Sequence, residues 1–170
     1  MKQFIPYRSK ILLGLAALVF TLGIGAGVGF ADNIQCNKAK GGCSATVDQN
    51  NGNLVITYNI TGLGGTAGGQ WVILFDVDGH ARCKNNGDNC PSAANKFGDT
   101  DQSVTGTFKV HNGNASGTIT VQPKSGLSCP GKQNPIILDV SYTEITFTVE
   151  GTQLLNVAGP LSASPLASCS

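Results

Sequence analysis

The chain has 170 residues, and its eleven Lys and Arg residues nearly balance ten Asp and Glu residues. Only 12% of the residues are charged and no basic stripe is present, which argues against nucleic acid as a partner. Glycine is abundant, at 23 residues, as are Thr, Ser and Asn. This composition favours an extracellular domain of strands and turns with a neutral, hydrogen-bonding surface.

Residues 1–31 predict a signal peptide, because Lys2, Arg8 and Lys10 precede an uncharged run from Ile11 to Ala31. The run approaches the roughly 20 apolar residues that span a bilayer, so an uncleaved N-terminal anchor is the alternative. Its glycines weaken a helix, and Gly29 and Ala31 suit a cleavage site before Asp32. We expect cleavage, with membrane contact only before it, leaving eight basic and ten acidic residues, a net charge of −2.

The first half of the remaining chain predicts three strands. Residues 44–48 form a short candidate, and residues 54–63 alternate apolar and polar side chains with the period of a half-buried strand. A flexible loop follows at 62–69. Residues 70–77 (QWVILFDV) are the most apolar run, and we expect a central strand buried on both faces.

A turn is predicted at Asp78-Gly79, followed by an irregular, Asn-rich excursion from Cys83 to Cys90. Residues 103–110 and 115–122 are two Thr-rich strands joined by His111-Asn112-Gly113-Asn114. Because Asn-Gly tolerates the positive φ angles of a type I′ turn, these strands predict a β-hairpin.

Residues 135–150 predict a long strand in which the parity of the apolar residues changes at Thr143-Glu144. A bulge there would keep both apolar sets facing the core. Residues 153–157 predict one last strand. Residues 159–170 form a Pro-, Ser- and Ala-rich tail, expected to be irregular and tied down by Cys169.

Seven or eight short strands without helical periodicity predict an all-β fold: an immunoglobulin-like antiparallel two-sheet sandwich over residues 32–158. A closed barrel is the second choice. Trp71 is expected to pack in the core, since Val72, Ile73 and Leu74 follow it.

Two stretches carry a resemblance. The segments Cys83-Lys84-Asn85-Asn86-Gly87 with Pro91 to Lys96, and Cys129 to Gln133 running into Leu138 to Thr143, resemble an uncharacterised family of secreted bacterial proteins. The resemblance implies a small exported β-domain and brings no activity with it. A looser similarity, in fold only, is to the immunoglobulin-like apoproteins that carry enediyne antibiotics.

Six cysteines after the leader predict three disulfides in an oxidising compartment. The short, turn-rich spacings favour the pairs Cys36–Cys43 and Cys83–Cys90, which leaves Cys129 to pair with Cys169. The main alternative joins Cys83 to Cys129, and six cysteines allow 15 connectivities.

No catalytic motif is present, so we expect no enzyme activity and no cofactor. His80 and His111 are interpreted as solvated turn residues. Asp76 and Asp78, two residues apart on an extended chain, make a Ca²⁺ site the alternative to solvated carboxylates. Asn59 and Asn114 begin N-glycosylation sequons.

These features favour a secreted or cell-surface binding or carrier module for an unknown extracellular ligand. Loops on a rigid sandwich commonly carry function, and the candidate ligand-loop residues are Gly64, Gly65, Asn85, Asn86 and Asp88. One alternative is a self-assembling structural subunit of a filament, coat or matrix. A second is a small secreted hydrolase or hydrolase inhibitor.

Overall fold

Nine β-strands and one short 3₁₀ helix form the described part of the computed structural model, which comprises residues 33–65 and 68–169. They are β1 (Gln35–Cys36), η1 (Lys38–Lys40), β2 (Cys43–Val47), β3 (Leu54–Thr61), β4 (Gly68–Lys84), β5 (Asn95–Lys109), β6 (Ala115–Val121), β7 (Asn134–Val149), β8 (Thr152–Val157) and β9 (Leu161–Ala163). The predicted signal peptide, residues 1–31, lies outside the described residues. Among the described elements, no helix has the length and apolar character needed to cross a bilayer.

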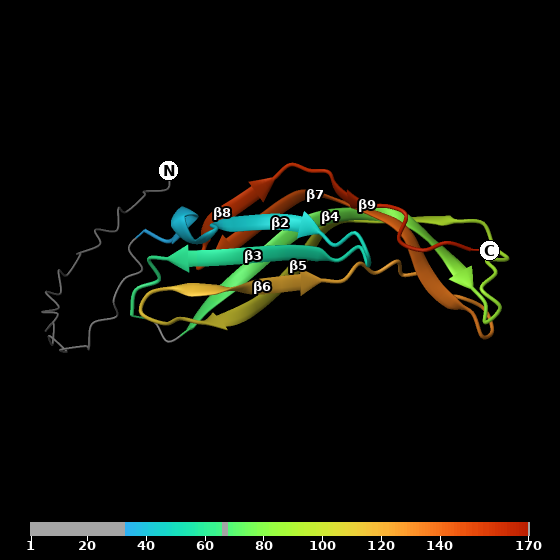
Figure 1. Cartoon of the computed structure of the whole chain (residues 1–170), viewed down its shortest axis with the longest axis horizontal. Helices are drawn as coiled ribbons and strands as arrows, with labels where there is room; N and C mark the ends of the chain where they lie inside the picture. Colours follow the sequence, from blue (N-terminus) through green and yellow to red (C-terminus); the bar gives the residue numbers. More distant parts are fainter. Residues whose placement is uncertain (1–32, 66–67, 170) are drawn as a thin grey trace, which may run out of the picture.

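The strands form two antiparallel sheets that face each other (Figure 1). In the first sheet β3 is central, with β6 along one edge and β1 and β2 along the other. In the second sheet β4 lies between β5 and β7, and β8 and β9 both pair with the other edge of β7. The prediction of an all-β, two-sheet, disulfide-linked sandwich is confirmed, with nine described strands instead of seven or eight.

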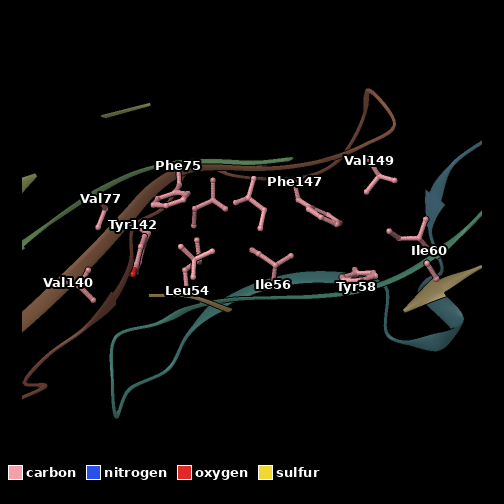
Figure 2. Packing of buried hydrophobic residues seen from close by; sticks show 14 of the residues in the cluster. Leu54, Ile56, Tyr58, Ile60, Phe75, Val77, Val140, Tyr142, Phe147 and Val149 are labelled. Carbon is pink, nitrogen blue, oxygen red and sulfur yellow. The ribbon is translucent and has the colours of Figure 1, made fainter. Parts of the chain in front are cut away.

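The core lies between the sheets and follows directly from the alternation in β3. Leu54, Ile56, Tyr58 and Ile60 are buried, as the period-2 pattern predicts. Figure 2 shows these side chains pointing toward Phe147, Phe75 and their neighbours on the opposite sheet. Trp71 also packs against this cluster, as predicted.

The predicted interruption of the long strand is confirmed in β7. The pairing of β4 with β7 shifts between Leu74 and Asp76, where β7 has one extra residue, and Glu144 has a φ of +50°. The bulge reverses the side-chain parity. As a result, Tyr142 before it and Ile145 after it are both fully buried.

Strand β4 is longer than predicted, and the expected turn at Asp78-Gly79 is wrong. The strand continues to Lys84, paired with β5 as far as Ala81 and with β7 as far as Lys84. Gly79 serves close packing here, because a Cβ atom at this position would collide with the Asp139 backbone and the Phe97 ring. The prediction that residues 70–77 are buried on both faces is also wrong, since Leu74, on the outer face of the second sheet, is 43% exposed.

The predicted hairpin is correct in its turn and in the presence of both strands, but the pairing of these strands with each other is wrong. Asn112 and Gly113 have φ angles of +50° and +72°, as a type I′ turn requires, and His111 pairs with Asn114. Beyond this pair, β5 joins β4 in the second sheet whereas β6 joins β3 in the first. The turn therefore links the two layers.

The C-terminal tail is more ordered than expected. It contains β9, and beyond that strand the backbone N–H of Leu166 donates a hydrogen bond to the carbonyl of Leu138 at 2.8 Å. The Leu166 side chain lies against Gly52, where an added Cβ atom would come within 2.6 Å of it. The tail thus closes the side of the core between the turn that contains Gly52 and β7.

All six cysteines form disulfides: Cys36–Cys43, Cys83–Cys129 and Cys90–Cys169. The predicted Cys36–Cys43 pair is confirmed. The favoured Cys83–Cys90 and Cys129–Cys169 pairs are wrong, and the alternative Cys83–Cys129 pair is confirmed. Cys83 belongs to β4 and is buried, which turns it away from the loop that carries Cys90. Cys90 is left to hold Cys169 and the tail.

Candidate ligand-binding groove

The proximal end of the molecule, which holds η1 and the 111–114 turn (left in Figure 1), is built around a disulfide loop. The Cys36–Cys43 bond, with a sequence separation of seven, closes a short loop that contains η1. Asn59 of β3 holds this loop in place: its backbone carbonyl accepts a hydrogen bond from the Asn37 N–H at 2.7 Å, and its backbone N–H donates to Gly42 O at 2.9 Å. The amide side chain of Asn59 donates to the Lys40 carbonyl at 3.3 Å. Lys40 is thereby fixed beside β3.

The 111–114 turn contributes a second rigid wall. The backbones of His111 and Asn114 are joined by two hydrogen bonds of 2.8 and 3.0 Å, and the Asn114 side chain donates to the carbonyl of Asn112 at 2.7 Å. The N–H of Leu63 also donates to the Gly113 carbonyl at 3.0 Å, which attaches the preceding loop to the turn.

Together these segments line a groove of about 450 Å³. We call this the basic groove, lined by Lys40, Asn59, Lys109, His111, Asn112, Asn114, Ala115 and Ser116. Its titratable side chains are two lysines and a histidine, and none of its lining residues is an Asp or Glu. Neither lysine forms an ion pair with any other described residue. The groove therefore offers unneutralised positive charge together with neutral amide and hydroxyl groups.

A second, wider hollow of about 840 Å³ adjoins the groove at Lys109 and extends over Gly68, Gly69, Gln70, Thr107, Phe108 and Glu150. Glu150 is the acidic member of this hollow, and its carboxylate accepts a hydrogen bond from the backbone N–H of Gln70 at 2.5 Å. The Glu150 carboxylate is thus held beside Gln70, in the hollow and outside the lining of the basic groove.

The predicted ligand-loop residues do not come together. Gly64 and Gly65 lie at the proximal end, where Gly64 touches Gly113. The loop with Asn85, Asn86 and Asp88 lies at the other end of the 17-residue strand β4. At about 3.3 Å per residue, the two loops are about 50 Å apart. They cannot contribute to one small-ligand site.

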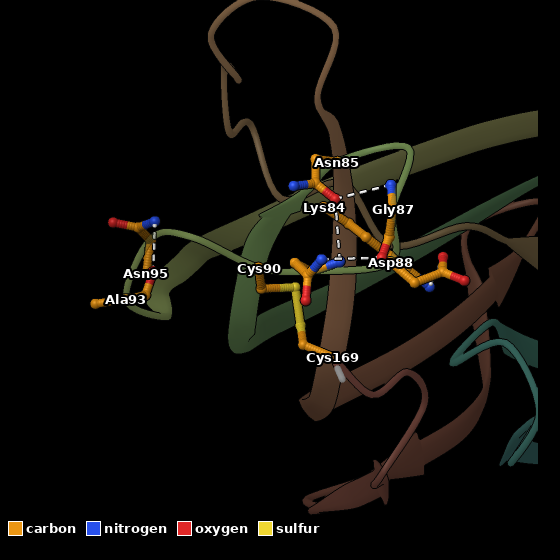
Figure 3. Close-up of a disulfide and its surroundings, with 9 residues drawn as sticks. Lys84, Asn85, Gly87, Asp88, Cys90, Ala93, Asn95 and Cys169 are labelled. Carbon is orange, nitrogen blue, oxygen red and sulfur yellow. Dashed lines mark hydrogen bonds and ion pairs between the residues drawn. A yellow bond between two sulfur atoms is a disulfide. The ribbon is translucent and has the colours of Figure 1, made fainter.

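The distal loop, residues 85–94, has an internal structural network (Figure 3). The side-chain oxygen of Asn85 accepts hydrogen bonds from the N–H groups of Gly87 and Asn89 at 2.9 and 3.0 Å. Lys84 forms an ion pair with Asp88 at 2.9 Å, and the Cys90–Cys169 disulfide ties the loop to the tail. These polar groups therefore form their hydrogen bonds and ion pair with one another, within the loop and with Lys84 at its start.

The candidate Ca²⁺ residues lie on β4, on the outer face of the second sheet. Asp76 accepts a hydrogen bond from the backbone N–H of Asp101 at 2.8 Å, and Asp78 is exposed. In the part of the chain that the structure describes, no three His, Cys, Asp or Glu side chains are grouped to hold a metal ion. His80 lies in the same strand, and its ring Nδ1 is 2.9 Å from an Asp139 carboxylate oxygen. The interpretation of His80 as a turn residue is therefore wrong.

Sequence reasoning did not identify the groove as a site. Lys40 and Asn59 come from two separate segments, and the other six lining residues lie within residues 109–116, at the predicted hairpin turn; no motif connects the three segments. The signals that could have located the site were the short Cys36–Cys43 spacing and the Asn-Gly turn, which mark two rigid loops. No protein-family model, curated protein or solved structure matches this chain.

Proposed function

We propose that this chain is a secreted, non-enzymatic binding module with an immunoglobulin-like sandwich, and that its ligand carries an anionic group held in the basic groove. The observation that carries the proposal is the charge of that groove: Lys40, Lys109 and His111 line it without any carboxylate. Hydrogen bonds from a charged donor contribute about 1.5–3 kcal/mol each. Lys40 and Lys109 can each donate such a bond to a carboxylate, sulfate or phosphate group in the groove.

Secretion is supported by two independent features. The first 31 residues have the charge and hydropathy pattern of a signal peptide. Three disulfides are typical of domains that fold in an oxidising compartment. The Cys36–Cys43 disulfide would also keep the loop that carries Lys40 rigid outside the cell.

The structural-subunit alternative has less support. Self-assembly by strand addition needs an open, regular strand edge, and β5, with 15 residues, is the longest edge strand among the described elements. Its distal half carries Lys96, Asp99 and Asp101, and its pairing with β4 shifts at Asp101, where φ is +53°. Charges and a bulge are features that prevent edge pairing. The hydrolase alternative rests on no comparable observation.

The proposal is tested by titrating the full-length secreted protein with sodium sulfate and with glucuronic acid, at low and at physiological ionic strength, and following backbone amide shifts by NMR. We expect shifts at residues 40, 59 and 111–116. The substitutions Lys40→Gln and Lys109→Gln should each weaken binding at least fivefold, because each removes a charged donor. Lys124→Gln, which lies outside the groove, is the matched control. Unchanged affinity in both groove variants would refute the proposal.

A further inference from the structure

The outer face of the first sheet carries an ordered array of neutral hydroxyl groups. Side chains alternate along β3, so Thr57 and Asn59 point outward when Leu54, Ile56, Tyr58 and Ile60 are buried. Register places Ser44 and Thr118 on either side of Thr57, and Ser116 beside Asn59. We call this surface the hydroxyl face; its polar members are Ser44, Thr46, Thr57, Asn59, Ser116, Thr118 and Thr120, and its apolar member, Val55, lies between Thr46 and Thr120.

The hydroxyl face is free to bind a ligand. Ser44, Thr57 and Thr118 are exposed, and none of their hydroxyl groups forms a hydrogen bond with another described residue. The face contains no charged and no aromatic side chain. It can therefore exchange hydrogen bonds with a neutral, hydroxyl-rich partner, but it provides neither a stacking platform nor a site for a polyanion along its whole length.

The hydroxyl face and the basic groove are continuous. Asn59 and Ser116 form the last cross-strand pair of the face, and both also line the groove. A chain lying along β3 and β6 toward the proximal end would thus pass from neutral hydroxyl groups to Lys40, Lys109 and His111. Figure 1 shows β2, β3 and β6 side by side, leading to that end.

We propose that the two surfaces together bind a glycan chain in which a carboxylate-bearing sugar occupies the basic groove and neutral sugars lie along the hydroxyl face. This inference rests on the proposed function and assigns its ligand class. Sugar hydroxyl groups both donate and accept hydrogen bonds, as Ser and Thr do. The basic groove is positively charged and the adjoining hydroxyl face is neutral. This charge pattern matches a glycan chain with an anionic sugar next to an uncharged one.

The test compares three probes on the full-length protein by isothermal titration calorimetry: a hexasaccharide in which one terminal glucuronate is followed by five neutral glucose units, glucuronic acid alone, and the neutral cellohexaose. We expect the hexasaccharide to bind at least tenfold more tightly than glucuronic acid, since only the longer ligand reaches the hydroxyl face. Cellohexaose should bind more weakly than the hexasaccharide, because it lacks the carboxylate.

Substitution then separates the two surfaces. The double variant Thr57→Val and Thr118→Val keeps the β-branched shape and removes two hydroxyl groups, so it should fold normally. It should weaken hexasaccharide binding at least threefold and leave glucuronic acid binding unchanged. The control is Thr105→Val, on the outer face of the other sheet. The Lys40→Gln variant should weaken both ligands.

These experiments distinguish failure of the glycan inference from failure of the proposed anion-binding function. Equal affinity for the hexasaccharide and glucuronic acid, or no effect of the threonine double variant, would overturn the glycan inference while the anion-binding function stands. Failure of glucuronic acid, sulfate and the hexasaccharide to bind would overturn both.

Discussion

Tyr142 shows how a single side chain joins distant parts of this fold. Its ring is fully buried, and its hydroxyl donates a hydrogen bond to the carbonyl of Gly52 at 2.9 Å across 90 positions of sequence. Burial raises the pKa of this hydroxyl above its ordinary value. Tyr58 is also buried, but its hydroxyl forms no hydrogen bond with any described residue. The two tyrosines therefore provide a matched pair.

We expect Tyr142→Phe to lower the free energy of unfolding by about 1–3 kcal/mol, because it leaves the Gly52 carbonyl without its partner. Tyr58→Phe should change the free energy of unfolding by about a few tenths of a kcal/mol at most, because the Tyr58 hydroxyl forms no hydrogen bond with a described residue that the substitution would remove. Urea unfolding measured by tryptophan fluorescence checks both values. Equal effects of the two substitutions would contradict this role of Tyr142.

Asp48 makes the turn before β3 sensitive to pH. Its side chain accepts hydrogen bonds from the backbone N–H of Asn50 at 2.9 Å and from the Asn51 side chain at 2.7 Å. The hydrogen bond from the Asn50 backbone is the main cause that lowers the pKa of this carboxyl group in the folded state. The unfolded chain therefore takes up a proton at this group at a higher pH than the folded chain does.

The contribution of Asp48 to stability should accordingly be complete above the ordinary pKa of aspartate and disappear as the pH falls through the lowered value. Thermal unfolding between pH 2 and 6 should show the stability difference between the natural protein and Asp48→Asn shrinking as acid is added. If the stability difference between the two proteins stayed constant over this pH range, the Asp48 carboxylate would be excluded as its source.

Glycines opposite aromatic residues shape the strands at the scale of whole elements. The Trp71 ring lies over Gly106 of the neighbouring strand, and the Tyr58 ring lies over Gly117. In each pair the glycine has no side chain, so the aromatic ring of the neighbouring strand can lie over its backbone. Designed sheets use the same pairing of an aromatic residue with a glycine. Thr-rich strands with scattered glycines are thus compatible with a close-packed sandwich.

We expect Gly106→Ala to destabilise the protein by about 1–3 kcal/mol, because a methyl group would overlap the Trp71 ring and force it to move. Gly65→Ala is the control, since a Cβ atom there has no other atom within 4 Å. Calorimetric melting temperatures of both variants check the prediction. If Gly106→Ala had the same melting temperature as the natural protein, the Trp71 ring would be able to move without loss of stability, and the prediction would be wrong.

The elements differ in how well sequence predicted them, and the difference has a physical basis. The burial pattern of β3 and the bulge in β7 were predictable because alternation is a local property of the chain. The partners of β5 and β6 were not, since the choice between a hairpin and two sheets depends on pairing with β4 and β3. The local Cys36–Cys43 disulfide was predictable from its short spacing, whereas the pairs that involve Cys83, Cys90, Cys129 and Cys169 depend on the tertiary fold. The basic groove is assembled from three segments of the chain, so its two rigid loops were the local signals available.

The three disulfides divide the molecule into two ends with different roles. Cys36–Cys43 closes the short loop that carries Lys40, whereas Cys83–Cys129 and Cys90–Cys169 tie long segments together at the distal end. By loop-closure entropy, the 79-residue separation of Cys90–Cys169 contributes about 4.5 kcal/mol and the seven-residue separation of Cys36–Cys43 about 2.4 kcal/mol. Stability and ligand binding should therefore respond differently to the loss of each bond.

Replacing Cys90 and Cys169 together by Ser should cause the larger fall in melting temperature and leave glucuronic acid binding unchanged. Replacing Cys36 and Cys43 should cost less stability but weaken binding at least threefold, because Lys40 is no longer held beside Asn59. Calorimetry and titration of the same two variants check both parts. Loss of binding in the Cys90 and Cys169 variant alone would place the ligand at the distal end instead.

The length of β4 determines where a label or a solid support can be attached to this protein without blocking the basic groove. Residues 85–94 are separated from the basic groove by the whole strand, about 50 Å at 3.3 Å per residue. Exposed loop tips tolerate insertions well. A fluorophore, an affinity tag or a solid support joined at Asn86 or Ser92 would leave the groove pointing into solution, so the protein can serve as an oriented capture reagent.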